Sequence, residues 1–315
     1  QDIAVFGIVP QLRVRKQQIA LAEKAYELSA LQVAQEVKTA WGEAFVAKRR
    51  YKAFSRLDSV YQGFERAVGL RYEVEAISRL QWLSASSQAS QIRLQQQQAY
   101  SDYFSALERL NLWLGGDSFY TVPEELENAP PDAGLLLTEG LQQHPALELA
   151  RQETALAEAE YKAARADFLP KLSLEGGMQE VNGNSGFYSY QLGISIPILS
   201  GKNYGRTKAA RIETEIAEQT ARYRETELQS EYRQALQEYQ KWKHSWQYYE
   251  EEALPLAAEQ QKGALLALNE GAVEYVAFIQ MLDEVVQVEL NALDALENYL
   301  QALAELQFYL NNKAN

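Results

Sequence analysis

The sequence predicts a mainly helical protein with a small β part, in which long antiparallel helical hairpins alternate with short strands. Three observations support this fold class. Glycine and proline are sparse, with 17 and 8 among 315 residues, and leave long tracts of helix-forming residues between them. Residues 188–198 alternate between apolar and polar over about the length at which a tilted strand crosses a bilayer. The two halves of the chain also resemble each other, which predicts a two-fold internal repeat.

The first repeat is assigned to residues 1–116. Its opening, QDIAVFGIVP, is interpreted as the end of a strand, and a long helix is predicted over 11–66. The helical pattern breaks around 67–76. A second helix is predicted from about 78 to 114, where Gly115 and Gly116 provide a C-terminal glycine cap. Because the opening resembles the end of a strand, we expect that an N-terminal portion precedes it in a longer chain.

Residues 117–135 contain three prolines and are predicted to form a connector, and residues 136–315 form the second repeat. This repeat is predicted to contain a helix over 136–167, a β-hairpin over 169–198 and a long helical hairpin over 203–311. The first helix of that hairpin is expected to end near Gly263. The last helix has the alternating spacing of three and four residues that is typical of a coiled-coil seam. The seam residues are Ile279, Leu282, Val286, Leu293, Leu296, Leu300, Leu303 and Leu310.

The repeat holds one register from the turn to the helix end, whereas upstream VKTAWGEAF at 37–45 aligns with YRQALQEYQ at 232–240 with a shift of 195. When each residue is aligned with the residue 196 positions later, LERLNLWL at 107–114 aligns with LAELQFYL at 303–310, and Glu75 aligns with Gly271. Each half therefore reads as a strand, a long helix, a tight turn and a second long helix.

The alternating strand indicates a membrane wall rather than a water-soluble bundle. We expect six side chains on one face of it to contact lipid: Tyr188, Tyr190, Leu192, Ile194, Ile196 and Ile198. A closed barrel needs about eight or more strands, and unpaired backbone groups cannot face lipid. The chain has too few strands to close one alone. Four strands from each of three chains would give a shared barrel of about twelve.

Composition argues against several function classes. The net charge of −13 argues against nucleic-acid binding, which needs a basic face. There is no cysteine, and two histidines and two methionines offer little for a soft-metal site, so we expect no metal and no cofactor. His144 and His244 are interpreted as surface or structural residues. No catalytic constellation is present, and we do not expect an enzyme.

Several motifs resemble those of the TolC-like outer membrane efflux proteins. RYEVEAISRLQWLSA at 71–85 resembles the first periplasmic turn of that family, and ALNEGAVEYVAFIQ at 267–280 resembles the second. ARADFLPKLSLEGG at 164–177 resembles the family's helix-to-strand junction, and ISIPILSGKNYGRTKAA its strand-to-helix junction. The ISRL form of the turn is similar to the heavy-metal efflux branch.

The sequence departs from the family pattern at some positions. Glu75 and Ala76 replace the usual glycine and acid of the first turn, and Gln81 replaces an aspartate. In some members an aspartate ring narrows the periplasmic entrance, but the matching positions here are Ala277 and Gln280, so that ring is not carried over. Other acidic residues near the second turn could supply negative charge: Glu270, Glu274 and Asp283.

The resemblance implies a homotrimeric outer membrane channel whose helices form an α-barrel that extends into the periplasm. A periplasmic adaptor protein and an inner-membrane pump would be its partners, and the channel would be a passive conduit gated at its turns. The residues assigned to the gate and to adaptor docking are Arg71, Tyr72, Ile77, Ser78, Leu80, Glu270, Gly271, Glu274 and Tyr275. Of these, Arg71, Tyr72 and Glu274 are expected to hold the closed state.

The alternative is a soluble periplasmic adaptor or a structural coiled-coil protein. A protein that stays monomeric and monodisperse without detergent would support this alternative.

Overall fold

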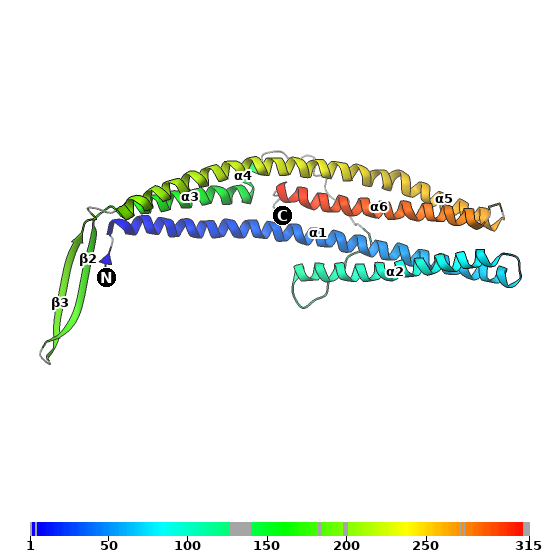
Figure 1. Cartoon of the computed structure of the whole chain (residues 1–315), viewed down its shortest axis with the longest axis horizontal. Coiled ribbons are helices and arrows are strands. Elements are labelled where there is room, and N and C mark those ends of the chain that lie inside the picture. Colours follow the sequence, from blue (N-terminus) through cyan, green and yellow to red (C-terminus); the bar gives the residue numbers. More distant parts are fainter. Residues whose placement is uncertain are drawn as a thin grey trace. The chain divides into compact units, whose positions relative to one another are not determined.

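The structure is a computed structural model that describes residues 2–3, 5–125, 140–181, 184–197, 201–270, 272–273 and 275–310. Long helices make up most of it, and β2 and β3 form a hairpin (Figure 1). The elements are β1 (Asp2–Ile3), α1 (Val5–Glu73), α2 (Arg79–Leu114), the 3₁₀ helix η2 (Gly140–Gln143), α3 (Pro145–Ala166), β2 (Lys171–Val181), β3 (Asn184–Ser195), α4 (Gly201–Tyr248), the π-helical segment η3 (Tyr249–Ala253), α5 (Leu254–Asn269) and α6 (Tyr275–Leu310). The predicted fold class, mainly α with a small β part, is confirmed.

The internal repeat extends to the ends of the helices. The first long helix is α1, and the second runs from Gly201 to Asn269 through α4, η3 and α5. The second long helix begins and ends 196 residues after α1 begins and ends. Helix α6 likewise begins and ends 196 residues after α2 begins and ends. The two repeats therefore have helical hairpins of equal length.

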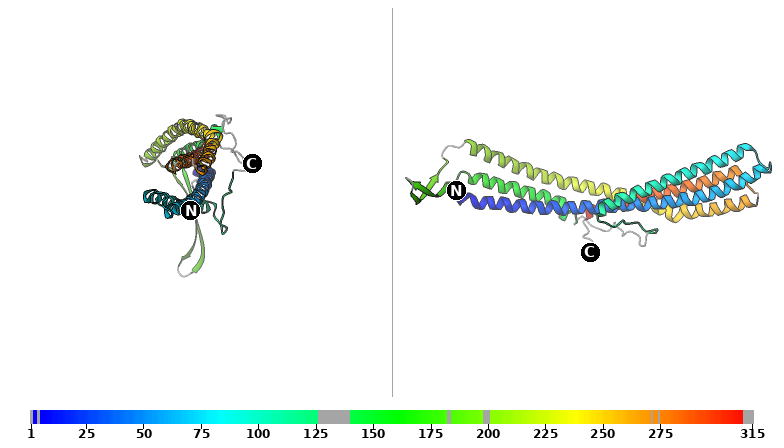
Figure 2. Two further views of the ribbon diagram at one scale, coloured as in Figure 1. Left: turned by 90° about the vertical axis from the view of Figure 1, so that its right-hand side faces the viewer. Right: turned by 90° about the horizontal axis from the view of Figure 1, so that it is seen from below.

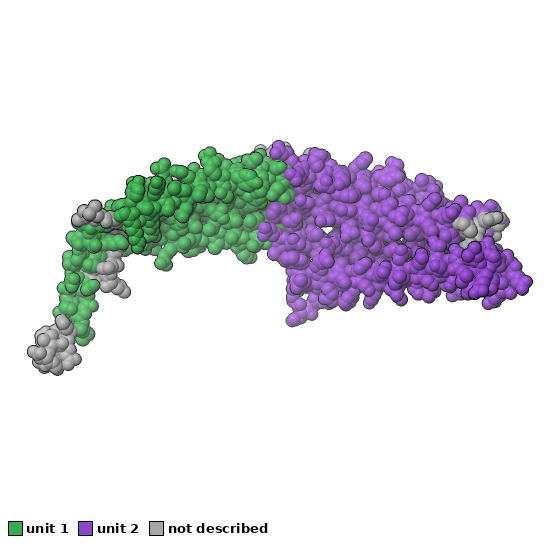
Figure 3. Space-filling view, in the orientation of Figure 1, with its two compact units in different colours: residues 1–31, 137–231, 309–315 green, residues 32–136, 232–308 purple. Residues whose placement is uncertain are grey.

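The chain divides into two compact units that do not follow the repeat boundary (Figure 3). Unit 1 comprises residues 1–31, 137–231 and 309–315, and unit 2 comprises residues 32–136 and 232–308. Each repeat contributes to both units. The division into repeats at 1–116, 117–135 and 136–315 thus describes the sequence and not the compact units.

In unit 1, α3 lies between α1 and α4 (Figure 2). Lys24 of α1 forms an ion pair of 2.6 Å with Glu148 of α3, and Arg206 of α4 forms one of 2.9 Å with Asp167 at the end of α3. His144 caps the start of α3: its Nδ1 accepts a hydrogen bond from the Ala146 N–H. The imidazole is completely buried and stacks on Tyr309, so its role is structural.

In unit 2, the apolar core lies between α1, α2, α5 and α6. The cluster comprises Phe54, Leu57, Tyr61, Ala89, Ile92, Ala99, Ala264, Phe278, Ile279, Leu282 and Val286. The predicted seam of α6 supplies Ile279, Leu282 and Val286 to this cluster and continues beyond it toward the end of the helix. All members of the seam are buried except Leu293, which is half-buried. This confirms the seam, since a heptad pattern places its apolar positions against neighbouring helices.

The end of α1 is a Schellman motif, in which backbone N–H groups beyond the helix bond to its last carbonyl groups. The Ala76 N–H donates to the Arg71 carbonyl and the Glu75 N–H donates to the Tyr72 carbonyl, each at 2.9 Å. Glu75 takes the left-handed position of this motif, with φ of 57°. In the second repeat, the Ala272 N–H donates to the Ala267 carbonyl at 2.8 Å, which is the equivalent bond at the repeat offset.

The start of α2 is a capping box. The Ser78 hydroxyl accepts from the Gln81 N–H, and the Gln81 side-chain oxygen accepts from the Ser78 N–H at 2.9 Å. Gln81, which departs from the family pattern, is therefore part of the cap that begins the helix. At the other end of α2, Gly115 has φ of 64°, which confirms the predicted glycine cap.

Five predicted helix boundaries differ from those of the structure. Helix α1 begins at Val5 and continues to Glu73, and the described residues before it form the two-residue strand β1. Helix α3 begins at Pro145, because residues 140–143 form a 3₁₀ turn. The second long helix begins at Gly201 and passes through Gly263 to Asn269. Glycine inside a helix costs only about 1 kcal/mol, which tertiary packing overcomes.

The second long helix contains an irregularity that α1 lacks. Residues 249–253 form a π-helical turn immediately before Pro255. Proline has no N–H to donate to the carbonyl four residues earlier, and a local π-helical turn accommodates that missing bond. No helix in the described part of the chain is both long and apolar enough to span a bilayer.

Gly42 allows α1 to approach α6 closely. A Cβ atom on Gly42 would lie 3.2 Å from the Leu300 Cβ, whereas one on Gly63 of the same helix would meet no atom within 4 Å. Gly42→Val is therefore expected to lower the free energy of unfolding by about 1–3 kcal/mol through overpacking. Gly63→Ala is the control, and should be neutral or stabilising by up to about 1 kcal/mol. Denaturant unfolding followed by circular dichroism measures both, and equal effects would contradict the close approach.

Glu75 has a left-handed backbone conformation that glycine adopts without cost. Glu75→Gly is expected to stabilise the turn by about 1 kcal/mol, because a side chain in this region costs that much. Glu73→Gly, the same change at the last residue of α1, should instead destabilise by up to about 1 kcal/mol. The two midpoints of thermal unfolding should move in opposite directions. If both fall, Glu75 does not occupy the left-handed position.

Candidate functional site

The β-hairpin of unit 1 has two chemically different faces. Strands β2 and β3 pair antiparallel, and residues that are directly opposite each other point to the same side of the hairpin. Leu172 pairs with Ile194 and Met178 with Tyr188, which gives one apolar face. The opposite face carries the pairs Lys171–Ser195, Ser173–Gly193, Glu175–Gln191 and Gly177–Ser189. This alternation is what a barrel wall needs between lipid and a polar lumen.

The side chains of the apolar face are exposed in the single chain. Tyr190 is 81% exposed and Leu192 is 75% exposed, and the other described members of the predicted lipid-facing set, Tyr188, Ile194 and Ile196, are also exposed. Ile198 lies outside the described residues. Exposed apolar side chains in such a row indicate contact with lipid or with another protein surface.

A second candidate site is the tip of unit 2, where α1, α2 and α5 end or begin. Tyr72 in the last turn of α1 stacks on Trp82 in the first turn of α2, with 5.4 Å between ring centroids and an interplanar angle of 11°. Leu70, Val74, Leu80 and Leu83 are exposed at this tip, and Leu80 is 77% exposed. The tip therefore presents a ridge of apolar side chains around an ordered turn.

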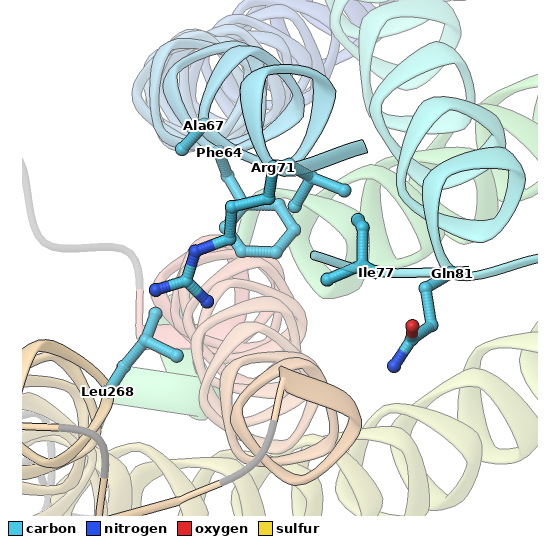
Figure 4. Close-up of a pocket in the computed structure, with 7 residues that line it drawn as sticks. Phe64, Ala67, Arg71, Ile77, Gln81 and Leu268 are labelled. Atoms are coloured by element: carbon cyan, nitrogen blue, oxygen red, sulfur yellow. The ribbon is translucent and has the colours of Figure 1, made fainter. Parts of the chain in front are cut away.

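A pocket of about 210 Å³ lies within the tip. Its apolar lining comes from Phe64, Ala67 and Val68 of α1, Ile77 before α2, and Leu268 of α5, and its polar lining comes from Arg71 and Gln81. Figure 4 shows the guanidinium of Arg71 extending toward Leu268, with Ile77 and Gln81 on the other side of the pocket. Arg71 makes no ion pair with any residue in the described part of the chain.

Close to the pocket, three residues before Phe64 on α1, a hydrogen-bond network joins three helices. Asp283 of α6 accepts a bond of 2.7 Å from the Tyr61 hydroxyl of α1 and one of 2.9 Å from the Gln88 amide of α2. Bonds to a charged group are worth about 1.5–3 kcal/mol each. Asp283 therefore ties α6 to the hairpin of α1 and α2.

The predicted gate residues have different positions and roles in the structure. Arg71 and Ile77 line one pocket together with Gln81, which was not assigned to the gate, and Ser78 acts as the N-cap of α2. Glu270 caps α5, with its backbone N–H bonded to the Leu266 carbonyl, and Tyr275 is the first residue of α6. Gly271 and Glu274 lie outside the described residues.

Sequence reasoning missed Tyr61 and Gln88 as partners of Asp283, although Asp283 itself stands out as an acid near the second turn. The seven-residue spacing of Phe54, Tyr61 and Val68 could have placed Tyr61 in the core. Gln88 had no sequence signal. Within the described residues, no group of histidine, cysteine and acidic side chains is arranged to hold a metal ion.

Comparison with solved structures identifies the fold. A membrane protein from Pseudomonas aeruginosa superimposes with a TM-score of 0.84 at 19% identity, covering 98% of this chain and 72% of that one. CusC, whose structures concern folding and transmembrane channel formation, gives 0.80 at 19% identity, with 98% and 75% covered. The Campylobacter jejuni CmeC outer membrane channel gives 0.78 at 17% identity, with 98% and 69% covered.

Comparison at the level of sequence identifies the protein family, whereas the solved structures identify the fold. No curated protein sequence matches the chain. Residues 136–312, more than half of the chain, match the sequence profile described as "Outer membrane efflux protein". The chain therefore belongs to the outer membrane efflux protein family.

Proposed function

We propose that this chain is a subunit of the outer membrane duct of a tripartite efflux or secretion system. The observation that carries the proposal is the two-faced hairpin, with apolar side chains on one side and polar residues on the other. In a single chain the outer edge of β3 has no described strand beside it. Lipid cannot satisfy such an edge, so neighbouring chains would have to supply its partner. A homotrimer with a shared barrel meets that requirement.

The helices would form the part of the duct that crosses the periplasm. In this arrangement the protein performs no chemistry and binds no cofactor, and helix pairs shift between a closed and an open packing. The tip of unit 2 would be the gate. The Asp283 network supports this assignment, because it joins α6 to α1 and α2 by bonds that must break if these helices separate.

An adaptor protein would dock at the same tip, and an inner-membrane pump would complete the system. The exposed apolar side chains of Leu70, Val74 and Leu80 support this docking surface, because a group of exposed apolar side chains is typical of a protein interaction site. Ile77, Ser78, Glu270, Gly271 and Tyr275 belong to this surface in the proposal. The ISRL form of the first turn favours the heavy-metal branch of the family.

The hairpin assignment predicts that one face tolerates charge and the other does not. Leu192→Lys is expected to reduce assembly in the outer membrane, because a lysine on the lipid face costs about 2–4 kcal/mol near the midplane. Gln191→Lys is the matched control on the opposite face and should assemble like the parent. Membrane fractionation measures both variants. Equal assembly would contradict the lipid face, and a parent that is a monodisperse monomer without detergent would favour the adaptor alternative.

The gate assignment predicts that breaking the Asp283 network favours the open state. Asp283→Ala removes the acceptor for two bonds. Because the bond from Gln88 is exposed, a loss of at least about 1.5 kcal/mol per subunit is expected, which should raise the open-to-closed ratio at least about tenfold. Glu284→Ala carries the same change of charge at the next residue, and should conduct like the parent. Conductance in planar bilayers is the measurement.

Arg71→Ala and Glu274→Ala are expected to raise conductance in the same assay. If Asp283→Ala and Glu284→Ala conduct alike, the network does not hold the gate. If the variants at Arg71 and Glu274 conduct like the parent, these two residues do not hold the closed state.

A further inference from the structure

The pocket at the tip of unit 2 combines a mostly apolar lining with two polar side chains, those of Arg71 and Gln81. Phe64, Ala67, Val68, Ile77 and Leu268 provide an apolar body, and they come from α1, from the turn before α2 and from α5. These side chains meet around an unfilled volume of about 210 Å³. The pocket opens to solvent, because Ala67 and Arg71 in its lining are exposed, so a volume of this size is accessible to a ligand.

The polar groups at the pocket are hydrogen-bond donors. The Gln81 side-chain oxygen is already engaged, because it accepts from the Ser78 N–H at 2.9 Å and from the Ser78 hydroxyl at 3.1 Å. Its NH₂ group and the guanidinium of Arg71 remain as donors. No carboxylate among the described residues pairs with Arg71, which is the only charged side chain in the described lining. A guanidinium fork fits a carboxylate in a bidentate manner.

The volume of the pocket limits the size of the ligand. Apolar cavities of about 150 Å³ accommodate benzene, whereas drug-sized ligands need about 300 Å³ or more. The volume of this pocket lies between these values. One aromatic ring with one carboxylate matches both the volume and the pattern of donors.

We propose that the pocket formed by Phe64, Val68, Arg71, Ile77, Gln81 and Leu268 binds a small aromatic or similarly apolar monocarboxylate. Its apolar body lies against α1 and Leu268, and its carboxylate accepts hydrogen bonds from Arg71 and Gln81. A ligand in this position contacts α1, α2 and α5 together and holds the three ends in their present arrangement. This holding effect rests on the proposed function, in which separation of the ends of α1, α2 and α5 opens the duct.

Binding is tested on the purified full chain in detergent with benzoate, and with benzamide as the uncharged probe of the same shape. Ligand-observed NMR, with detergent alone as the blank, gives the dissociation constant, which for so small a ligand is expected on the order of 1 mM. Arg71→Met removes the guanidinium, and Ala67→Leu fills the pocket from an exposed helical position. Arg66→Met is the matched control, because Arg66 is exposed on the same helix and does not line the pocket.

Saturable benzoate binding that weakens at least tenfold in Arg71→Met and in Ala67→Leu, and is unchanged in Arg66→Met, supports the site. Benzamide should bind the parent more weakly than benzoate and should be insensitive to Arg71→Met. The site is overturned if benzoate shows no saturable binding, or if its affinity is the same in all four proteins. Helical circular dichroism of each variant establishes that it is folded.

A second measurement separates this inference from the proposed function. Benzoate is expected to lower the conductance of the parent in planar bilayers and to have no effect on Arg71→Met. Benzoate that binds without changing conductance overturns the holding effect. A protein that binds benzoate but forms no channel contradicts the proposed function and leaves the site intact. A channel that conducts but binds no benzoate overturns the proposed site and agrees with the proposed function.

Discussion

The packing of the α6 seam is the interaction on which the helical part of the protein depends. Leu296 is fully buried in this seam, and Leu282 is 2% exposed. Burial of such a side chain contributes about 1.5–3 kcal/mol relative to leaving it exposed. Because α1, α2 and α5 all place apolar residues against the first half of α6, this one helix organises unit 2. The Asp283 network and the tip pocket lie beside that packed core, toward the turn between α1 and α2.

Much of this architecture could be predicted from the sequence, because period and spacing are local properties. The heptads of α6 predict its buried face, and the alternation at 188–198 predicts a strand, which the structure pairs in a hairpin. The offset of 196 residues from the turn to the helix end predicts a repeated helical hairpin, and the helix bounds in the structure agree with it. Ser78 is assigned to the turn only by resemblance, although the S-x-x-Q pattern at 78–81 is itself a helix-start signal.

Other features could not be predicted, because they depend on contacts between residues far apart in the sequence. Asp283 meets Tyr61 and Gln88 across 222 and 195 residues, and no spacing rule encodes such a contact. The burial of His144 depends on its stacking against Tyr309 at the other end of the second repeat. The predicted helix end at Gly263 is wrong because glycine often ends helices but need not do so. Gly263 is exposed and its missing side chain would meet nothing, so it neither caps nor interrupts the helix.

The π-helical turn at 249–253 has a geometric consequence for the second long helix. A single π-helical turn takes up about one extra residue, and one residue corresponds to about 100° of rotation around the axis. The side chains of α5 are therefore out of phase with those of α4, although the helix has the same number of residues as α1. Of two helices with equal numbers of residues, the second therefore changes its rotational phase before its last turns, whereas α1 is a continuous α-helix.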